Sequence, residues 1–243
     1  MLSFWQVTGI VLVAAMAAFV SKLSGFGFGL IVVPVLSLFV GPQDAVIVST
    51  LLGLVTTANQ SWTERDHADV VLVRRLFFSA CLGMPLGLLV FVFVPERGLR
   101  MVLGAVVVVA ALLLARGFQL SASSRRTELA MGFVSGVLNT SVSTNGPPLV
   151  FLLHARGYEP RVFRGTISRV FFYSNIFSSA LFIAAGKVHT AATLAAALSL
   201  PLVFVMQWIG SVVQRHVHGN RFRVLVLGLL FLSGVSAVAA ALR

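Results

Sequence analysis

Two polar, glycine-rich stretches interrupt an otherwise apolar sequence, and their residues could bind an anion. The first reads KLSGFGFG (residues 22–29) and the second reads NTSVSTNGPP (residues 139–148). Helices that begin just after these breaks, near Gly29 and Gly146, would direct free backbone N–H groups and positive dipole ends at a shared cavity. The alternative is that the glycines let helices pack closely and the hydroxyls cap helix ends. The candidate binding residues in the breaks are Lys22, Ser24, Gly25, Gly27, Gly29, Asn139, Ser143, Thr144, Asn145 and Gly146.

The charges within the apolar segments give the predicted ligand its sign. Lys22 lies at the first break, and Arg169 lies about 10 Å into an apolar segment if that segment is helical. All the acidic residues are expected in or beside loops: Asp44, Glu64, Asp66, Asp69, Glu96, Glu128 and Glu159. Buried cations without a buried carboxylate need an anionic partner. Lys22 and Arg169 therefore favour a small anion, unless both side chains extend to the membrane surface instead.

Two asparagines extend the candidate site along the chain. Asn59 and Asn175 occupy matching places in the two halves, and Ser168, Asn175 and Ser179 fall close to one helical face. A buried amide is costly unless it is hydrogen-bonded. These side chains therefore either line a transport path or bind neighbouring helices to one another.

Catalytic and metal-binding patterns are missing from the sequence. It contains no HExxH, GxSxG or Walker A pattern, and Cys81 is its single cysteine. His216 and His218 are separated by one residue in a basic stretch, which is typical of a solvated loop. We therefore predict that the protein is not an enzyme, that it has no metal site and that it needs no cofactor.

Composition places the chain in a membrane. The mean hydropathy is +0.99, and only 10% of the residues are charged, whereas soluble domains carry about 25%. The formal charge of +11 would suggest nucleic acid in a soluble protein. Here arginines clustered in short loops are read as a membrane-topology signal. The expected partners are thus the lipid bilayer and a small anionic substrate, and not nucleic acid. The first apolar segment lacks a preceding cationic stretch, which favours an inserted helix over a cleaved signal peptide.

The sequence repeats itself at an offset of 116 residues. Thr50 then falls on Thr166, Asn59 on Asn175, and Pro85 on Pro201. The repeats would be residues 1–118 and 127–243, joined by a cytoplasmic linker at 119–126. Each begins with two short apolar segments, at Val7–Ser21 and Leu30–Val40 in the first repeat and at Leu129–Leu138 and Pro147–His154 in the second. Three longer spans follow in each, at 45–61, 70–94 and 98–115, and at 164–186, 191–213 and 222–242.

The number of crossings and the loop charges predict that the repeats are inverted. Each short pair, whether a re-entrant hairpin or two truncated spans, returns the chain to its starting side, and three further crossings leave it on the other side. Loops 62–75, 116–126, 156–164 and 214–223 hold 12 cations against 4 on the opposite side. The positive-inside rule makes those loops cytoplasmic and both termini periplasmic. The predicted fold is all-α: a polytopic transmembrane helix bundle with two inverted-topology repeats, each a short broken helix pair plus three spans.

The two breaks and their surroundings resemble the sulfite exporter TauE/SafE family. The resemblance rests on the glycine-rich first break followed by Gly41-Pro-Gln-Asp-Ala, and on Gly146-Pro-Pro-Leu followed by Gly157. It covers about residues 7–240. It implies a permease of the bacterial inner membrane for sulfite or small organosulfonates such as sulfoacetate.

These observations together predict a secondary transporter for a small anion, with the site between the repeats. Ser143, Thr144, Asn145 and the two helix starts would hold the anion, and Lys22 or Arg169 would neutralise it. Rocking of one repeat against the other would give alternating access. An anion channel, a non-transporting assembly subunit and a membrane enzyme are the alternatives, and the sequence leaves open whether the chain forms a homodimer.

Overall fold

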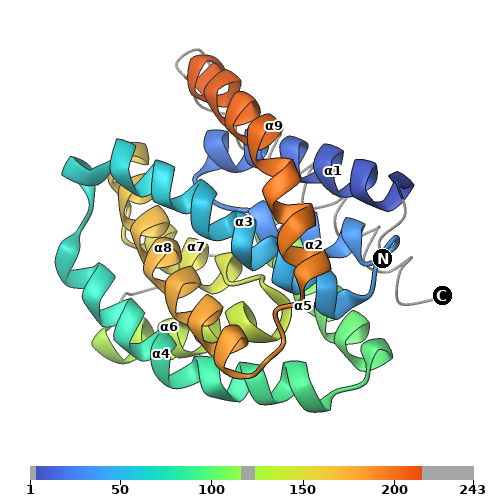
Figure 1. Cartoon of the computed structure of the whole chain (residues 1–243). Coiled ribbons are helices and arrows are strands. Elements are labelled where there is room, and N and C mark those ends of the chain that lie inside the picture. Colours follow the sequence, from blue (N-terminus) through green and yellow to red (C-terminus); the bar gives the residue numbers. More distant parts are fainter. Residues whose placement is uncertain (1–3, 116–123, 215–243) are drawn as a thin grey trace.

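The computed structural model describes residues 4–115 and 124–214, and within these ranges the protein is built of α-helices without strands (Figure 1). The helices of the first half are α1 (Phe4–Ser24), α2 (Phe28–Leu36), α3 (Pro42–Thr63), α4 (Val70–Phe93) and α5 (Glu96–Ala115), with a single 3₁₀ turn at Arg65–His67. Those of the second half are α6 (Arg125–Val142), α7 (Gly146–Ala155), α8 (Pro160–Ala184) and α9 (Thr190–Gln214). The predicted span at 222–242 lies outside the described residues.

Local sequence signals set the helix ends. Pro42 and Pro160 occupy the first positions of α3 and α8, where a missing N–H costs nothing. The Asp69 carboxylate accepts from the Leu72 N–H at the start of α4. Gly25 and Ser143 adopt the left-handed conformation directly after α1 and α6, which stops each helix at its break.

Each repeat starts with one long and one short helix, and not with two short ones. Helix α1 has 21 residues and α6 has 18, so Val7–Ser21 and Leu129–Leu138 were predicted too short. At about 31 Å, α1 is long enough to cross the hydrocarbon core. Helices α2 and α7, with 9 and 10 residues, are not. The polar residues Ser21, Lys22 and Asn139 do not interrupt their helices, because neighbouring helices bury them. Within the described ranges, α1, α4, α8 and α9 are long and apolar enough to span a membrane.

The two long–short pairs are hairpins that enter the bundle from opposite ends. In the first, the Gln6 amide at the start of α1 donates to the Phe39 carbonyl just past α2, at 2.9 Å. In the second, Glu128 at the start of α6 pairs with Arg156 at the end of α7. Helix α3, about 33 Å long, starts beside the base of the first hairpin and ends beside that of the second, where Asp69 and Tyr158 meet. The hairpins are therefore inverted relative to one another.

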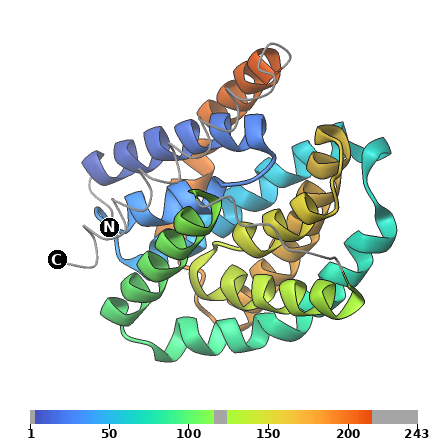
Figure 2. The same cartoon turned by 180° about the vertical axis from the view of Figure 1, so that it is seen from behind.

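The two repeats are interlaced and do not form separate bodies. The most extensive helix contacts pair α1 with α9 and α4 with α6. The first helix of each repeat, α1 or α6, thus packs on a helix of the other repeat, and these partners, α9 and α4, hold equivalent places in the helix order. In Figures 1 and 2, these two pairs lie on opposite sides of the bundle, with α3 between them. An added Cβ at Gly136 of α6 would overlap the Ala80 carbonyl of α4, and this close contact explains the need for glycine there.

Helix boundaries repeat at an offset of 118 residues rather than 116. Ser24 at the end of α1 corresponds to Val142, and Pro42 corresponds to Pro160. The offset of 116 aligns Pro85 with Pro201 but misplaces the breaks, because the connections between helices differ in length. At 118, Gly25 corresponds to Ser143, so the left-handed residue after the first long helix occurs at the same place in both repeats.

Candidate functional site

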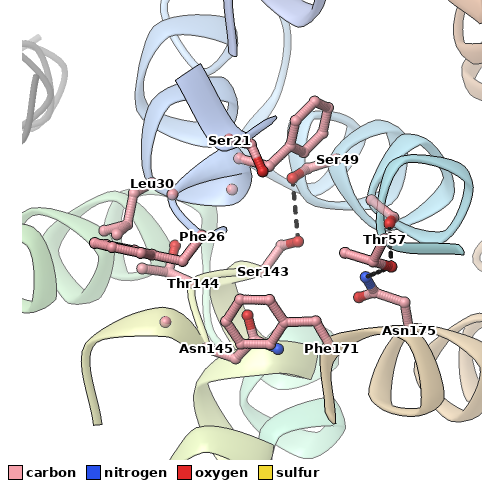
Figure 3. A pocket seen from close by; sticks show the side chains of 15 residues that line it. Ser21, Phe26, Leu30, Ser49, Thr57, Ser143, Thr144, Asn145, Phe171 and Asn175 are labelled. Carbon is pink, nitrogen blue, oxygen red and sulfur yellow. Dashed lines mark hydrogen bonds between the residues drawn. The ribbon is translucent and has the colours of Figure 1, made fainter. Parts of the chain in front are cut away.

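A cavity lies where the two breaks meet inside the bundle (Figure 3). The space open to water-sized spheres is about 30 Å³, room for about two water molecules. The lining residues come from the first break and its flanks, from α3, from the second break and from α8. They are Ser21, Phe26, Gly27, Phe28, Gly29, Leu30, Ser49, Gly53, Thr57, Ser143, Thr144, Asn145, Gly146, Phe171 and Asn175. The two breaks thus line one shared cavity.

The starts of α2 and α7 face this cavity with uncapped backbone. The first four N–H groups of a helix have no partner within it, and in α2 these belong to residues 27–30. In α7, Pro147 and Pro148 have no N–H, so only Asn145 and Gly146 supply one. No side chain caps either helix start. The alternative that the break hydroxyls serve as N-terminal caps is therefore wrong for these two helices.

A close backbone contact holds the two breaks together. A Cβ at Gly29 would overlap the carbonyl oxygen of Ser143. Ser143 itself is left-handed, with φ of 51°, and its hydroxyl donates to Ser49 Oγ at 3.1 Å. Thr50 of α3 donates to the same Ser143 oxygen at 3.3 Å. The glycine is therefore needed for contact between the breaks, and Ser143 links the second break to α3.

One wall of the cavity is polar and carries an unpartnered donor. The Asn145 side chain is only 9% exposed, and its Nδ2 has no hydrogen-bond partner. On the other side, Asn175 Nδ2 donates to Thr57 Oγ1 at 3.4 Å. Figure 3 shows Ser143 between these groups. Buried polar groups are rarely left without a partner, so the free amide of Asn145 indicates a place for an acceptor.

The other wall is apolar. Phe26, Leu30 and Phe171 surround the start of α7, with Phe26 Cδ2 and Leu30 Cδ1 3.6 and 3.7 Å from where a Gly146 Cβ would be. Phe26 in turn packs edge-on against Phe163, at a centroid distance of 6.4 Å. The cavity therefore combines hydrogen-bond donors on one side with hydrocarbon on the other, and no acidic residue lines it.

Several of the sequence-predicted residues line the cavity and others lie outside it. The lining ones are Gly27, Gly29, Ser143, Thr144, Asn145, Gly146 and Asn175. The remaining ones are Lys22, Ser24, Gly25, Asn59, Asn139 and Arg169. Lys22 and Gly25 are the chain neighbours of the lining residues Ser21 and Phe26, and the Ser24 hydroxyl donates to the Phe26 carbonyl at 2.6 Å.

The three other predicted residues serve helix contacts in this structure. Asn59 donates to Gln207 Oε1 of α9 at 2.9 Å. Asn139 donates to Ser178 Oγ and to the Ser174 carbonyl of α8. Arg169 is turned away and donates to the Arg65 carbonyl at 3.1 Å.

The lining residues on α3 were missed. Ser49, Gly53 and Thr57 recur every four residues and so fall on one helical face. Their spacing was visible in the sequence, but small polar residues are common at helix contacts in membranes. Only the position of the cavity distinguishes a lining serine from a packing one.

Charged residues gather at one end of the bundle, where α3 ends and α4, α6 and α8 begin; we call this the arginine-rich end. Glu128 is 2% exposed and pairs with Arg75, at 3.1 Å, and with Arg156. Glu128 lies in the first turn of α6, beside a loop as predicted, but it is buried, so the expectation that no carboxylate is buried is wrong. Two arginines from α4 and the end of α7 neutralise it, so its burial requires no further cation.

The same end holds a second carboxylate in a hydrogen-bond network. The Tyr158 hydroxyl donates to Asp69 Oδ2 at 2.5 Å, and Arg156 lies 3.5 Å from that oxygen. Burial opposes ionisation of Asp69, but the hydrogen bonds from Tyr158 and Leu72 and the charge of Arg156 hold its pKa below the ordinary value. Burial and the bond to Asp69 raise the pKa of Tyr158. These groups fasten the base of the second hairpin to α4.

Comparison with known proteins bears on the whole chain. The sequence profile described as sulfite exporter TauE/SafE matches residues 10–237. Comparisons with curated proteins and with solved structures gave no match. The matched region contains both breaks, the cavity and every described helix from α2 to α9. The chain therefore belongs to the sulfite exporter TauE/SafE family, a family of membrane transporters.

Proposed function

We propose that the protein is a secondary transporter that exports a small anion, sulfite or an organosulfonate such as sulfoacetate, across the bacterial inner membrane. The observation that carries the proposal is the cavity between two uncapped helix starts, which hydroxyls and amides line and no acidic residue lines. Helix starts of this kind attract anions through their free N–H groups and positive dipole ends.

The donors in the cavity suit an oxyanion. The start of α2 offers the N–H groups of residues 27–30, and the Asn145 side chain adds a buried donor that has no other partner. The hydroxyls of Ser49, Ser143 and Thr57 can rotate to donate to the ligand. An oxyanion has several acceptor oxygens and no donor of its own, so it can satisfy these groups together.

The apolar wall bears on the choice between the two proposed substrates. Sulfite is pyramidal, with three oxygens on one side of its sulfur and no carbon, whereas sulfoacetate has a methylene group between its two acidic groups. Phe26, Leu30 and Phe171 would contact such a carbon. Both ligands are anions, so the polar wall does not distinguish them. Sulfoacetate would cover more of the apolar wall than sulfite would.

Export is also favoured energetically. An inside-negative potential drives each negative charge outward by about 2.3 kcal/mol per 100 mV. Because no carboxylate lines the cavity, we propose no carboxylate-based Na⁺ or proton site. In this arrangement the arginine-rich end is cytoplasmic, and Phe4 at the start of α1 is on the periplasmic side.

The proposal is tested with purified protein and with proteoliposomes. Binding of sulfite, sulfoacetate, sulfate, taurine and acetate is measured by calorimetry, and flux of the binding anions is then followed. We expect Asn145→Asp to abolish binding and flux, because it puts a negative charge beside the ligand. Asn59→Asp, the same change outside the cavity, should retain both. Failure of the wild-type protein to bind or transport any of these anions would overturn the proposal. Saturation and trans-stimulation would distinguish a carrier from a channel.

A further inference from the structure

Lys22 is buried beside the cavity without an ion pair of its own. It lies in the last turn of α1 and is 5% exposed, and α9 covers it: a Cβ at Gly210 would be 3.0 Å from Lys22 Cβ. No carboxylate in the described ranges lies within 4 Å of its ammonium group. The charged side chains that act on it electrostatically are those of Glu64 and Arg164. A buried lysine without a close counterion indicates a place where an anion is missing.

Arg164 lies directly over the first break. Its Cγ is 2.9 Å from where a Gly25 Cβ would be, and its Nε lies 3.3 Å from Glu64 Oε1. The Glu64 and Arg164 side chains are mostly buried. Glu64 pairs with Arg164 and not with Lys22. The group of Lys22, Arg164 and Glu64 thus contains two cations and one carboxylate, and it carries a net positive charge.

This group adjoins the cavity on the side of the arginine-rich end. Ser21 and Phe26 line the cavity, and Lys22 and Gly25 are their neighbours in the chain. Gln60, one turn before Glu64 on α3, donates to Ser21 Oγ at 3.3 Å, and its own Oε1 is buried without a partner. An anion that travels between this end and the cavity through the first break would pass Lys22 and Arg164.

The repeat shows that the scaffold does not require these charges. At the offset of 118, Lys22 corresponds to Thr140, Glu64 to Phe182, and Arg164 to Val46. All three counterparts are buried and uncharged: Thr140 donates to the Met84 carbonyl, and Phe182 packs on Phe91 with ring centroids 4.9 Å apart. Apolar packing serves at the equivalent place in the other repeat. A buried ion pair seldom stabilises a protein more than uncharged packing does. The charges of Lys22, Arg164 and Glu64 therefore indicate a functional role.

We propose that Lys22 and Arg164 form a second anion site, a loading site between the arginine-rich end and the cavity, and that the Glu64 carboxylate occupies it in this conformation. The ligand is the same small oxyanion that the cavity takes, so the inference rests on the proposed function. Arriving anion displaces Glu64 from Arg164 and then passes to the donors of the two helix starts. Glu64 thereby keeps the site filled when no anion is present.

The test uses variants whose effects have opposite signs. The full-length protein is purified and binding of sulfite and of sulfoacetate is measured by calorimetry, with initial flux in proteoliposomes. Glu64→Gln removes the competing carboxylate and lowers the dissociation constant and the KM. Arg164→Gln raises both by about tenfold, the effect of losing one charged hydrogen bond, while flux at saturating anion stays within about twofold because the cavity is intact. Lys22→Gln raises both values as well.

Three further variants separate a loading site from a purely structural ion pair. A structural pair predicts that Glu64→Gln and Arg164→Gln weaken binding and lower the melting temperature alike. The double variant keeps a neutral pair, and a loading site predicts that it binds as weakly as Arg164→Gln. Glu96→Gln and Arg100→Gln break a more exposed ion pair at the other end of the bundle and should leave affinity unchanged.

The outcomes also distinguish this inference from the function on which it rests. If the wild-type protein transports an anion of the panel and the Glu64 and Arg164 variants match its affinity and KM, the loading site is wrong and the transporter stands. If Glu64→Gln binds more weakly than the wild type, the carboxylate is not a competitor and the loading site is also wrong. Absence of any anion binding or transport by the wild type refutes both.

Discussion

Asn175 and Thr57, whose side chains are hydrogen-bonded at 3.4 Å on one side of the cavity, are 118 residues apart, the same interval that separates the equivalent helix starts. They are therefore counterparts in the two repeats, on α8 and α3. Two equivalent positions can touch only where the local two-fold axis of a duplicated structure passes between them. The cavity thus lies beside the axis of the molecule, where each repeat contributes one helix start.

This position makes Thr57 a sensitive test of the site. Thr57→Val keeps the side-chain volume but removes the hydroxyl that accepts from Asn175 and can donate to a ligand. We expect the dissociation constant for sulfite to rise about fivefold, as for the loss of one hydrogen bond of about 1 kcal/mol. Thr56→Val is the matched control, because Thr56 also bonds the Gly53 carbonyl but does not line the cavity. Equal affinities of the two variants would place the ligand elsewhere.

Gly29 tests whether the two breaks must touch. In Gly29→Ala the new methyl group meets the Ser143 carbonyl, so the breaks are forced apart at a cost of about 1–3 kcal/mol. We expect a lower melting temperature together with weaker anion binding. Gly9→Ala on α1 is the control, since no atom lies within 4 Å of its added Cβ. A Gly29→Ala protein with wild-type melting and affinity would contradict the contact between the breaks.

Glu128 is expected to matter for stability rather than for transport. Glu128→Gln leaves Arg75 and Arg156 without their shared carboxylate at the base of the second hairpin. We expect the free energy of unfolding to fall by about 2 kcal/mol. This is less than for an isolated buried charge, because both arginines keep some contact with solvent. Glu159→Gln changes an exposed carboxylate nearby and should leave the melting temperature unchanged. Sulfite affinity measured well below the melting temperature should be the same in both variants; a selective loss of affinity in Glu128→Gln would contradict this role.

The network of Asp69 and Tyr158 predicts a pH dependence of stability with two limbs. The pKa of Asp69 is lowered in the folded protein, so its contribution is present above its ordinary pKa of about 4 and is lost as the pH falls through the lower folded value. The pKa of Tyr158 is raised, so its contribution is present below about pH 10 and is lost as the pH rises through the higher folded value.

Melting temperatures of the purified protein across this pH range check both limbs. Asp69→Asn should weaken the acid limb, and Tyr158→Phe the alkaline one. Asp66→Asn is the control for the acid limb, because Asp66 is exposed beside Arg65. An acid limb of wild-type size in Asp69→Asn would assign it to other carboxylates.

The sequence predicted the membrane fold and the meeting of the breaks because both depend on local composition. Apolar runs and glycine clusters are visible without knowledge of distant contacts. The length of α1 was underestimated for the converse reason. Lys22 and Ser24 are polar but buried by α9 and by the first break, and only that tertiary contact lets the helix continue through them.

The charges were harder to predict because their meaning depends on partners far apart in the chain. For Arg169 the sequence left open a role at the ligand or an extension to the membrane surface, and in the structure it bonds a carbonyl 104 residues away. Glu128 lies beside a loop as expected, but its burial between two arginines was not predicted. Residue type and spacing do not reveal such pairings when the intervening helices reverse direction several times.

The packing of α1 on α9 and of α4 on α6 also limits which pieces can move. Each of these two pairs combines one helix from each repeat. A rotation of one repeat as a rigid body against the other would have to separate both pairs, including the close contact at Gly136. Because α1 and α6 each pack most extensively on a helix of the other repeat, neither repeat alone would cover the faces that these two helices bury.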